Sequence, residues 1–416
     1  MNYTTVYVGM DVHKETFTLC CYTNEKEKAE YPQKVNGHYS KVLNYINAMR
    51  KHYGDDAVFV CGYEAGCLGF TLYHQLTEHN VACVILAHTT MPQPQGKKKV
   101  KTDKRDAMLI ARCLAHKDYS PVHIPTDIDE QVKEFIRMRD DHKLALKKVK
   151  QQIIAFCLRH DYQYTEGKSN WTEKHLQWLR SLEPDGMYAE ILEEYLLTYE
   201  YLTSKLEMLE SRIKELAELD EYKESVQKLR CFIGIDTITA LSLVVEVGDF
   251  HRFATAGHFM SYIGLTPGED SSGQNQNRLG ITKAGNRHLR KLLSESSQCI
   301  SRGKVGAKSV ALKKRQQGNP PAVIEYADKA NIRLRKRFYH LVLNKGKHRN
   351  IAIIAVSREL AGFIWGMMTE QFACDTTMYH QLQGLRHLRW CAAPLTLLLH
   401  CCSGLPSGLI RLLSHK

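Results

Sequence analysis

Short β-branched and aromatic stretches alternate with a helix-like stretch near the start of the chain. Residues 5–22 are rich in Val, Tyr, Phe and Thr and are broken by Gly-Met-Asp-Val-His-Lys at 9–14, which predicts two strands joined by a hairpin. Residues 57–63 and 81–86 predict two further strands, and residues 68–79 predict a helix between them. Strands that alternate with helices are typical of an α/β domain, which we expect over residues 1–125.

The pattern changes to long amphipathic helices after residue 125. Residues 128–160 predict one long charged helix, and a break at 166–170 separates it from a second helical stretch in which apolar residues recur at steps of four and three. This stripe consists of Tyr188, Leu192, Tyr195, Tyr199, Leu202, Leu206, Leu209, Ile213 and Leu216. The spacing leaves two arrangements open, an antiparallel helix pair within one subunit and a dimerising coiled coil. In both cases we expect a helical spacer without a catalytic role over residues 126–225.

Composition shifts again after residue 222. Residues 229–247 are apolar and contain Gly-Ile-Asp-Thr at 234–237, which resembles the turn of a helix-hairpin-helix motif. Such a turn presents backbone N–H groups to a phosphate, and a buried helix–turn–helix without a ligand is the alternative interpretation. The last expected helix covers residues 351–368. We expect a mostly helical C-terminal domain over residues 226–371 and an atypical tail, rich in Leu, Cys and His, over 372–416.

Size and charge narrow the class of protein. The chain has 416 residues, more than one hydrophobic core usually organises, so we expect at least two domains. With 57 Lys and Arg against 45 Asp and Glu, the formal charge of +12 favours a polyanionic partner such as nucleic acid. The 13 cysteines form no C-x-x-C pair, which indicates reduced core thiols in a cytoplasmic protein. We find no signal-peptide layout and no uncharged apolar stretch long enough to span a bilayer, and we expect no membrane partner.

Four acidic residues lie where a predicted strand ends or a predicted helix begins. They are Asp11, Glu64, Asp103 and Asp106, and the last two are three apart on one helix face. Clustered carboxylates repel one another unless divalent cations neutralise them, and Mg²⁺ prefers carboxylate oxygens together with water and phosphate. Two such ions can stabilise both the attacking and the leaving oxygen of a phosphoryl displacement. A single acid in such a place is usually a helix cap or a surface charge, but four in matching contexts favour a site for two Mg²⁺ ions.

The stretches around these acids resemble the motifs of DEDD transposases of the IS110 family of insertion sequences. The matching stretches are residues 7–14, 63–66 and 100–107, followed by 234–249, 262–267, 271–273 and 280–286, and their order agrees over roughly residues 3–371. The resemblance implies a RuvC-like (RNase H-like) fold for the first domain, a serine recombinase-like role for the last, and an element-encoded guide RNA. In this resemblance Ser272, directly before Gly273, takes the position of the nucleophile, and Ser271 is its neighbouring competitor.

Basic residues gather in three stretches. The first is an irregular loop at 93–101, and the second lies at 278–291, beside the serines, with no acid between Asp270 and Glu295. From these two we assign to nucleic-acid binding Lys97, Lys98, Lys99, Lys101, Arg278, Lys283, Arg287 and Arg290. A third stretch, 333–349, combines basic and aromatic side chains; it is a candidate for stacking on unpaired bases, with a solvated helix face as the alternative.

Three functions agree with these patterns. The first is an RNA-guided transposase in which Ser272 links covalently to DNA while Asp11, Glu64, Asp103 and Asp106 hold two Mg²⁺ ions. The second is a hydrolytic nuclease of Holliday-junction type, in which water attacks and the serine is structural. The third is a nucleic-acid-binding scaffold whose sites have decayed, which the atypical tail suggests. Under the first, donor and target DNA are exchanged together, so we expect a homo-oligomer, a dimer or a tetramer.

Overall fold

The computed structural model describes residues 4–66, 68–92, 102–269 and 277–372. The described residues up to Glu370 belong to one compact unit, and a separate unit begins at Gln371. Several residues singled out in the sequence lie outside the described residues, together with the tail from residue 373 on. These residues are Lys97, Lys98, Lys99, Lys101, Ser271 and Ser272.

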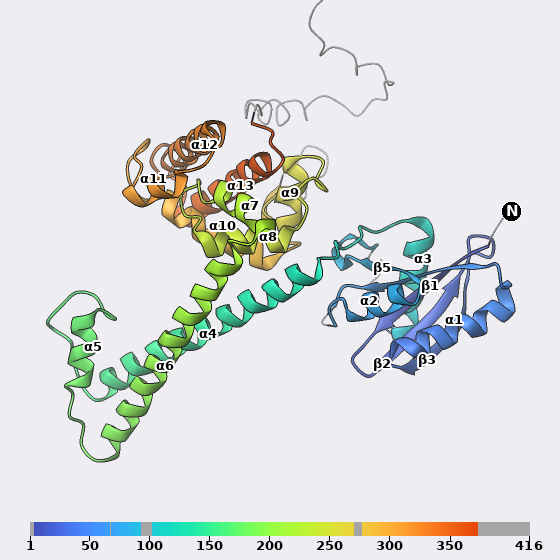
Figure 1. Ribbon diagram of the computed structural model, residues 1–416, viewed down its shortest axis with the longest axis horizontal. Coiled ribbons are helices and arrows are strands. Elements are labelled where there is room, and N and C mark those ends of the chain that lie inside the picture. The colour runs from blue at the N-terminus through green and yellow to red at the C-terminus, as the bar shows by residue number, and fades with distance from the viewer. Residues whose placement is uncertain (1–3, 67, 93–101, 270–276, 373–416) are drawn as a thin grey trace, which may run out of the picture. The chain divides into compact units, whose positions relative to one another are not determined.

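A five-stranded mixed sheet forms the N-terminal part of the first unit (Figure 1). Its strands are β1 (Thr5–Val12), β2 (Thr16–Tyr22), β3 (Ala29–Asn36), β4 (Val58–Glu64) and β5 (Ala82–Leu86). They lie in the order β3-β2-β1-β4-β5, with β1 antiparallel to β2 and parallel to β4, and β5 parallel to β4. The predicted hairpin and the two later strands are confirmed. The apolar pattern does not predict β3, because most of its side chains are exposed.

Helices cover both faces of the sheet. On one face are α1 (Tyr39–Tyr53), which is not among the predicted elements, and α2 (Thr71–Glu78); on the other is α3 (Asp103–His116). Along β1, Val8 and Met10 are fully buried in the core with α1 and α2, whereas Tyr7 packs towards α3. Because alternate residues of a strand point to the same side, Gly9 and Asp11 belong to the α3 face.

The α3 helix approaches β1 so closely that only glycine fits at position 9. A Cβ atom added to Gly9 would lie 2.1 Å from the carbonyl oxygen of Ala107 and 2.4 Å from the amide nitrogen of Ala111. Both are backbone atoms of α3, which cannot turn aside as the end of a side chain can. The glycine therefore allows the backbone of α3 to pack directly against β1.

We expect Gly9→Ala to lower the free energy of unfolding by about 3 kcal/mol or more, because the added methyl group overpacks the contact between β1 and α3. Urea unfolding followed by circular dichroism measures this loss. Gly66→Ala is the matched control, since a Cβ atom there would meet no atom closer than the carbonyl oxygen of Glu64 at 3.8 Å. Equal free energies of unfolding in the two variants would contradict the close approach.

Two long helices form an antiparallel hairpin within the chain (Figure 1). They are α4 (Asp127–Arg159) and α6 (Met187–Leu216), joined through α5 (Glu173–Arg180), which the sequence pattern does not predict. Leu192 and Leu202 from the α6 stripe pack with Ile153 and Phe156 of α4. The predicted stripe thus packs on an intramolecular helix pair, one of the two arrangements that its spacing allows.

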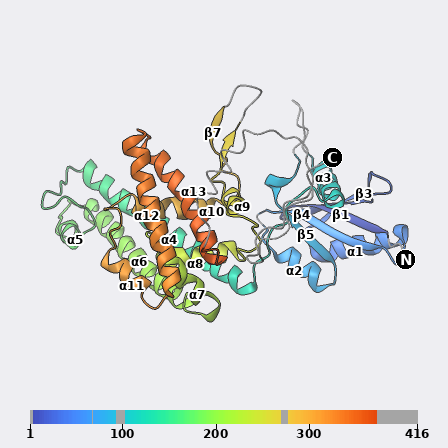
Figure 2. The ribbon, with the colours of Figure 1, turned by 90° about the horizontal axis from the view of Figure 1, so that it is seen from above.

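The remainder of the first unit is helical. Its elements are α7 (Asp220–Leu229), α8 (Thr237–Val247), α9 (Ala256–Ile263), α10 (Arg287–Ile300), α11 (Val310–Gln316), α12 (Pro321–Tyr339) and α13 (Arg349–Met368), with a short ribbon of β6 (Pro267–Glu269) and β7 (Arg278–Ile281), and a π-helical turn at His340–Asn344. The α12 and α13 helices lie side by side (Figure 2), and α13 also packs against α9 and α10.

Buried amide side chains hold the turn between α7 and α8. Asn331 and Gln316 both donate to the carbonyl oxygen of Cys231, at 3.2 and 3.3 Å. Asp236 caps α8 by accepting the backbone N–H of Thr239 at 2.7 Å. The predicted helix–turn–helix is therefore present. In the phosphate-binding interpretation, the backbone N–H groups at the start of α8 bind a nucleic-acid phosphate. In the structure, one of these groups, the N–H of Thr239, already donates to the carboxylate of Asp236.

Among the described residues, α13 is the one helix long and apolar enough to cross a membrane by length and composition. Within its most apolar stretch, 56% is buried inside the protein, as in the core helix of a helical domain. Two charged residues, Arg358 and Glu359, lie within α13. The helix is therefore not an uncharged apolar stretch of the kind that the sequence was found to lack.

The described cysteines are mostly buried, in agreement with the sequence. Burial raises the pKa of the Cys20 thiol to about 12 and that of the Cys21 thiol to about 11, so both remain protonated at neutral pH. Cys299 differs from the expectation because its side chain is exposed.

Candidate active site

The ends of two parallel strands bring Asp11 and Glu64 to the same edge of the sheet. Met10 of β1 pairs with Tyr63 of β4 in a parallel ladder, so Asp11 and Glu64 are the next residues on neighbouring strands. Both also belong to the α3 face, because they alternate with residues that point into the core with α1 and α2. The predicted positions at strand ends are thus confirmed for these two acids.

The other two predicted acids lie in the first turn of α3. Thr102 is the N-cap, and its hydroxyl accepts the backbone N–H of Arg105 at 3.4 Å. Asp103 and Asp106 follow within one turn, where the positive end of the helix favours carboxylates. The predicted start of a helix at these two acids is therefore confirmed.

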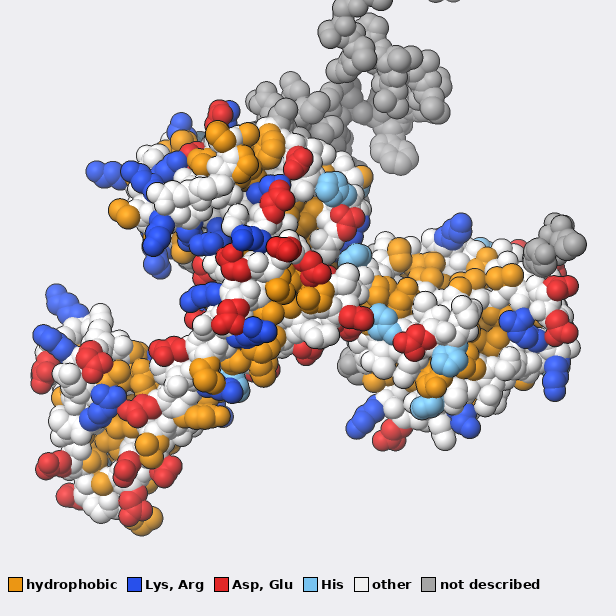
Figure 3. All heavy atoms as spheres, viewed as in Figure 1, with side chains coloured by type: hydrophobic (Ala, Val, Ile, Leu, Met, Phe, Trp, Pro, Cys, Tyr) orange, Lys and Arg blue, Asp and Glu red, His pale blue; other side chains and the backbone are white. Residues whose placement is uncertain are grey.

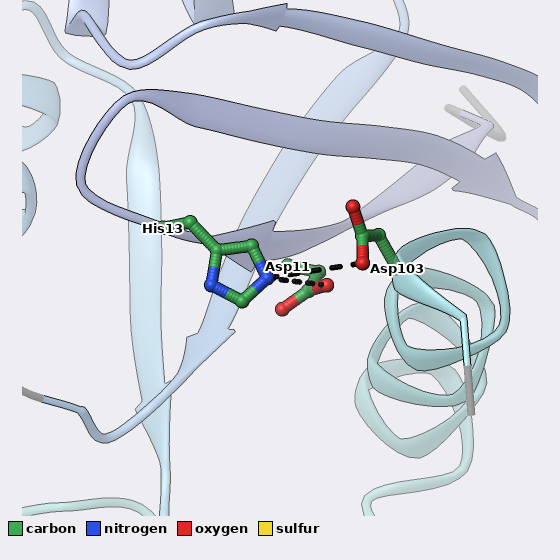
Figure 4. Close-up of side chains that lie close together, drawn as sticks. All are labelled: Asp11, His13 and Asp103. Atoms are coloured by element: carbon green, nitrogen blue, oxygen red, sulfur yellow. Dashed lines mark ion pairs between the residues drawn. The ribbon is translucent and has the colours of Figure 1, made fainter.

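Asp11 and Asp103 come together around His13 (Figure 4). The Nε2 atom of His13 lies 3.3 Å from Oδ2 of Asp11 and 3.9 Å from Oδ1 of Asp103. Asp11 is largely buried, with 16% of its side chain exposed, whereas Asp103 is 42% exposed. The imidazole of His13 therefore lies between Asp11 at the end of β1 and Asp103 at the start of α3.

Lys34 of β3 supplies a positive charge to the same place. Its Nζ atom donates to Oδ2 of Asp103 at 2.9 Å. This hydrogen bond, with a smaller contribution from nearby His13, lowers the pKa of Asp103 below its usual value. Asp103 is therefore ionised at neutral pH, as a metal ligand must be.

Glu64 has a different partner from the other acids. Its Oε1 atom lies 2.7 Å from Nδ1 of His88, which begins a 3₁₀ helix (His88–Thr90) just after β5. The sequence interpretation includes neither His88 nor His13. A signal for both exists, because His13 lies in the motif at 9–14 and His88 follows a strand that ends at the same sheet edge as β4.

The donor set at Asp11 fits a divalent cation. One ligand atom each from Asp11, Asp103 and His13 lies within 4.8 Å of the others. The carboxylate oxygens of Asp11 and Asp103 suit a hard cation such as Mg²⁺, and the exposure of Asp103 leaves room for the water ligands that Mg²⁺ retains. The imidazole of His13 suits transition metals, so we do not count it among the Mg²⁺ ligands. Glu64 and Asp106 are not in this group of closest atoms, although their backbone positions adjoin it.

The basic residues beside the serine segment differ in exposure. Lys283 and Arg287 are exposed, and Arg287 opens α10. Arg290 is partly buried and donates to the carbonyl oxygen of Ile263 at 2.8 Å, and burial together with nearby Arg287 lowers its pKa. Arg278 opens β7, opposite Glu269 of β6. Lys283 and Arg287 are therefore accessible to a nucleic acid, whereas the guanidinium of Arg290 is already engaged in a hydrogen bond within the protein.

The third basic stretch is divided between the helical core and the surface, because Lys336, Lys345, Lys347, His348 and Arg349 are exposed. Arg335 is buried and donates to the carbonyl oxygens of Ile300, Lys304 and Ala307. Arg333 and Arg337 form ion pairs with Glu359 of α13. These three arginines hold helices together, and Phe338, an aromatic residue of this stretch, is buried, so they do not offer the basic and stacking surface that the sequence suggests.

Another basic group, which the sequence analysis does not single out, lies on α11. Figure 3 shows Lys and Arg side chains gathered over this helix. Its last turn contains Lys313, Lys314 and Arg315. The two lysines are exposed, so this short helix adds positive charge to the surface of the helical part.

Comparison with known proteins decides the family. A family model of DEDD transposases of IS110 type matches residues 8–160, and a second, described as transposase IS116/IS110/IS902 family, matches residues 226–310. The transposase for insertion sequence element IS1533 of Leptospira borgpetersenii is 31% identical over 340 residues, which cover 81% of this chain and 96% of that protein. The chain belongs to the IS110 family of transposases.

More distant relatives of this IS110-family transposase cover most of its length. The transposase for insertion sequence element IS1111A of Coxiella burnetii is 25% identical over 88% of this chain and 90% of that protein. A pilin gene-inverting protein of Moraxella lacunata is 24% identical over 75% of this chain and 88% of that protein. The transposase is thus an enzyme that acts on DNA, cleaving it and transferring strands. The two matched regions contain all four predicted acids and Ser272.

Proposed function

We propose that this transposase cuts and rejoins DNA through attack by Ser272, with two Mg²⁺ ions held by Asp11, Glu64, Asp103 and Asp106. The observation that carries this proposal is the convergence of Asp11 and Asp103 within 4.8 Å, beside the strand end that holds Glu64. The strand order β3-β2-β1-β4-β5 further supports a RuvC-like fold for residues 1–125. A spacer at 126–225, a serine domain at 226–371 and a tail at 372–416 complete the proposed organisation.

In the proposed chemistry, the hydroxyl oxygen of Ser272 attacks the scissile phosphorus and forms a phosphoserine ester. The bond from phosphorus to the adjoining deoxyribose oxygen breaks, that oxygen leaves as a hydroxyl, and the serine proton is released. Mg²⁺ held by the four acids would stabilise the negative charge that develops on the reacting oxygens. One ester replaces another, so a DNA hydroxyl can attack the phosphoserine later and restore the DNA backbone without ATP.

The residues of the chain contribute positioning and charge. Asp11 is fixed on a central strand and Asp103 on the first turn of a packed helix, so both carboxylates are held in place before DNA arrives. Lys283 and Arg287 are exposed and suited to neutralising DNA phosphates, and we propose the same role for Arg278, for Arg290 and for the lysines at 97–101. DNA binding should therefore weaken steeply as salt rises.

The proposal includes a guide RNA encoded by the element and a cytoplasmic homo-oligomer, a dimer or a tetramer. The family resemblance supports the RNA, and the need to exchange two DNAs together supports more than one copy. The relative named as a pilin gene-inverting protein supports rejoining as well as cutting, because inverting a gene requires both steps.

Co-expression with the noncoding flanks of the element tests this proposal. We expect one flank-derived RNA to copurify with the protein, and sequencing to find joined donor–target junctions that have lost no nucleotides. Scrambled flanks of equal length are the control and should yield neither product. Precise junctions without a specific RNA would exclude RNA guidance, whereas cut ends without joined products would favour the hydrolytic nuclease.

A further inference from the structure

We propose that His74, Asp127 and Glu130 form a second metal site, for a divalent transition metal such as Zn²⁺. His74 lies on α2, and the two acids lie in the first turn of α4. One ligand atom from each lies within 4.8 Å of the other two. Asp127 and Glu130 are three apart, which places both carboxylates on one face of α4.

The environment of His74 favours a metal ligand over a simple ion pair. Its Nε2 atom has almost no solvent-accessible surface, although 33% of the side chain is exposed, and it makes no hydrogen bond within the described part of the chain. The nearest carboxylate oxygen, Oε2 of Glu130, lies 3.5 Å away, in a geometry that does not make a hydrogen bond. A shielded nitrogen without a partner costs free energy, and coordination of a cation by its lone pair removes that cost.

Helix capping alone does not account for these acids. Thr126 already caps α4 by accepting the backbone N–H of Asp129 at 3.2 Å, and Asp129 accepts the hydroxyl of Tyr222 at 2.7 Å. The carboxylates of Asp127 and Glu130 are left to face His74. Both acids also line a groove of about 730 Å³ along α4, which gives space for water molecules to complete a coordination shell.

The donor set selects the kind of metal. Imidazole suits Zn²⁺ and similar transition metals, whereas Mg²⁺ prefers oxygen ligands alone. Donor atoms on one Zn²⁺ ion lie roughly 3 to 4 Å apart, since each bond is about 2.0 to 2.2 Å, so small side-chain rotations suffice to close this site. The metal would tie the start of α4 to α2.

This site is separate from the candidate active site. The α2 helix packs with Met10 on one face of the sheet, whereas Asp11 and α3 belong to the other face. The proposal therefore stands whether or not Ser272 is a nucleophile. It also allows the second site to be measured in a protein that carries Asp11→Asn.

Zinc binding to the full-length Asp11→Asn protein, freed of metal by chelation, tests the proposal. We expect His74→Gln and Asp127→Asn each to bind one Zn²⁺ fewer per chain than this parent, or to bind that ion about a hundredfold more weakly, by calorimetry and elemental analysis. Zinc should also raise the melting temperature of the parent, but not that of either variant.

Two controls guard the result. His79→Gln, at the end of the same helix, should bind zinc as the parent does, because Nδ1 of His79 is hydrogen-bonded to the carbonyl oxygen of Gln75 at 2.8 Å. Melting temperatures without metal check that the variants fold, and Asp127 is exposed, so Asp127→Asn should fold normally. The same zinc stoichiometry and affinity in either Asp127→Asn or a folded His74→Gln as in the parent would overturn the proposal.

Discussion

Asp11→Asn lowers the rate of DNA cleavage by at least about a thousandfold, because it removes a charged ligand from the centre of the proposed metal site. Asn has the same shape, so the strand and its packing stay intact while the charge that holds the cation is lost. A gel assay of strand cleavage on DNA carrying the element ends, in the presence of Mg²⁺, measures the effect.

Asp56→Asn serves as the matched control for this result. Asp56 is an exposed acid before the start of β4, at the opposite end of that strand from Glu64, and its replacement should leave cleavage unchanged. DNA binding should survive in both variants, since neither removes a basic residue. A rate for Asp11→Asn within tenfold of the unmodified protein would remove Asp11 from the reaction.

Ser272→Ala should abolish the covalent protein–DNA adduct and lower strand transfer by at least about a thousandfold, because no other group replaces the attacking hydroxyl. Labelled DNA that stays with the denatured protein in a gel reports the adduct. The neighbouring Ser271→Ala is the control and should keep the adduct. Cleavage that persists in Ser272→Ala without an adduct would instead support attack by water.

The sheet and the positions of the four acids follow from the sequence because the central strands are buried. Val6, Val8 and Met10 alternate with residues of the other face, and this period of two is readable in the chain. Edge strand β3 carries no such signal, since one side of an edge strand is open to water. The α1 helix does carry one: Val42, Tyr45, Ile46 and Met49 are buried at helical spacing, so it could be predicted from the same rule.

The partners of the acids are harder to predict than the acids themselves. Lys34 reaches Asp103 across 69 positions of sequence, and only the order of the strands shows that β3 runs near α3. The prediction that the arginines at 333–337 bind nucleic acid is wrong for a related reason. The number of positive charges in a stretch does not show that Arg335 is buried among carbonyl oxygens. A run of basic residues therefore predicts a nucleic-acid-binding surface only when their side chains are known to be exposed.

The contacts of Lys34 and His13 with the acids should help this transposase to stay folded when no metal is bound. Carboxylates that depend on magnesium alone for neutralisation push their elements apart when magnesium is scarce. Here the ammonium of Lys34 already offsets part of that repulsion at Asp103, and the imidazole of His13 lies between Asp103 and Asp11. Under the proposed Mg²⁺ chemistry, removing magnesium should stop transposition but leave the protein folded, so that activity returns when the ion is restored.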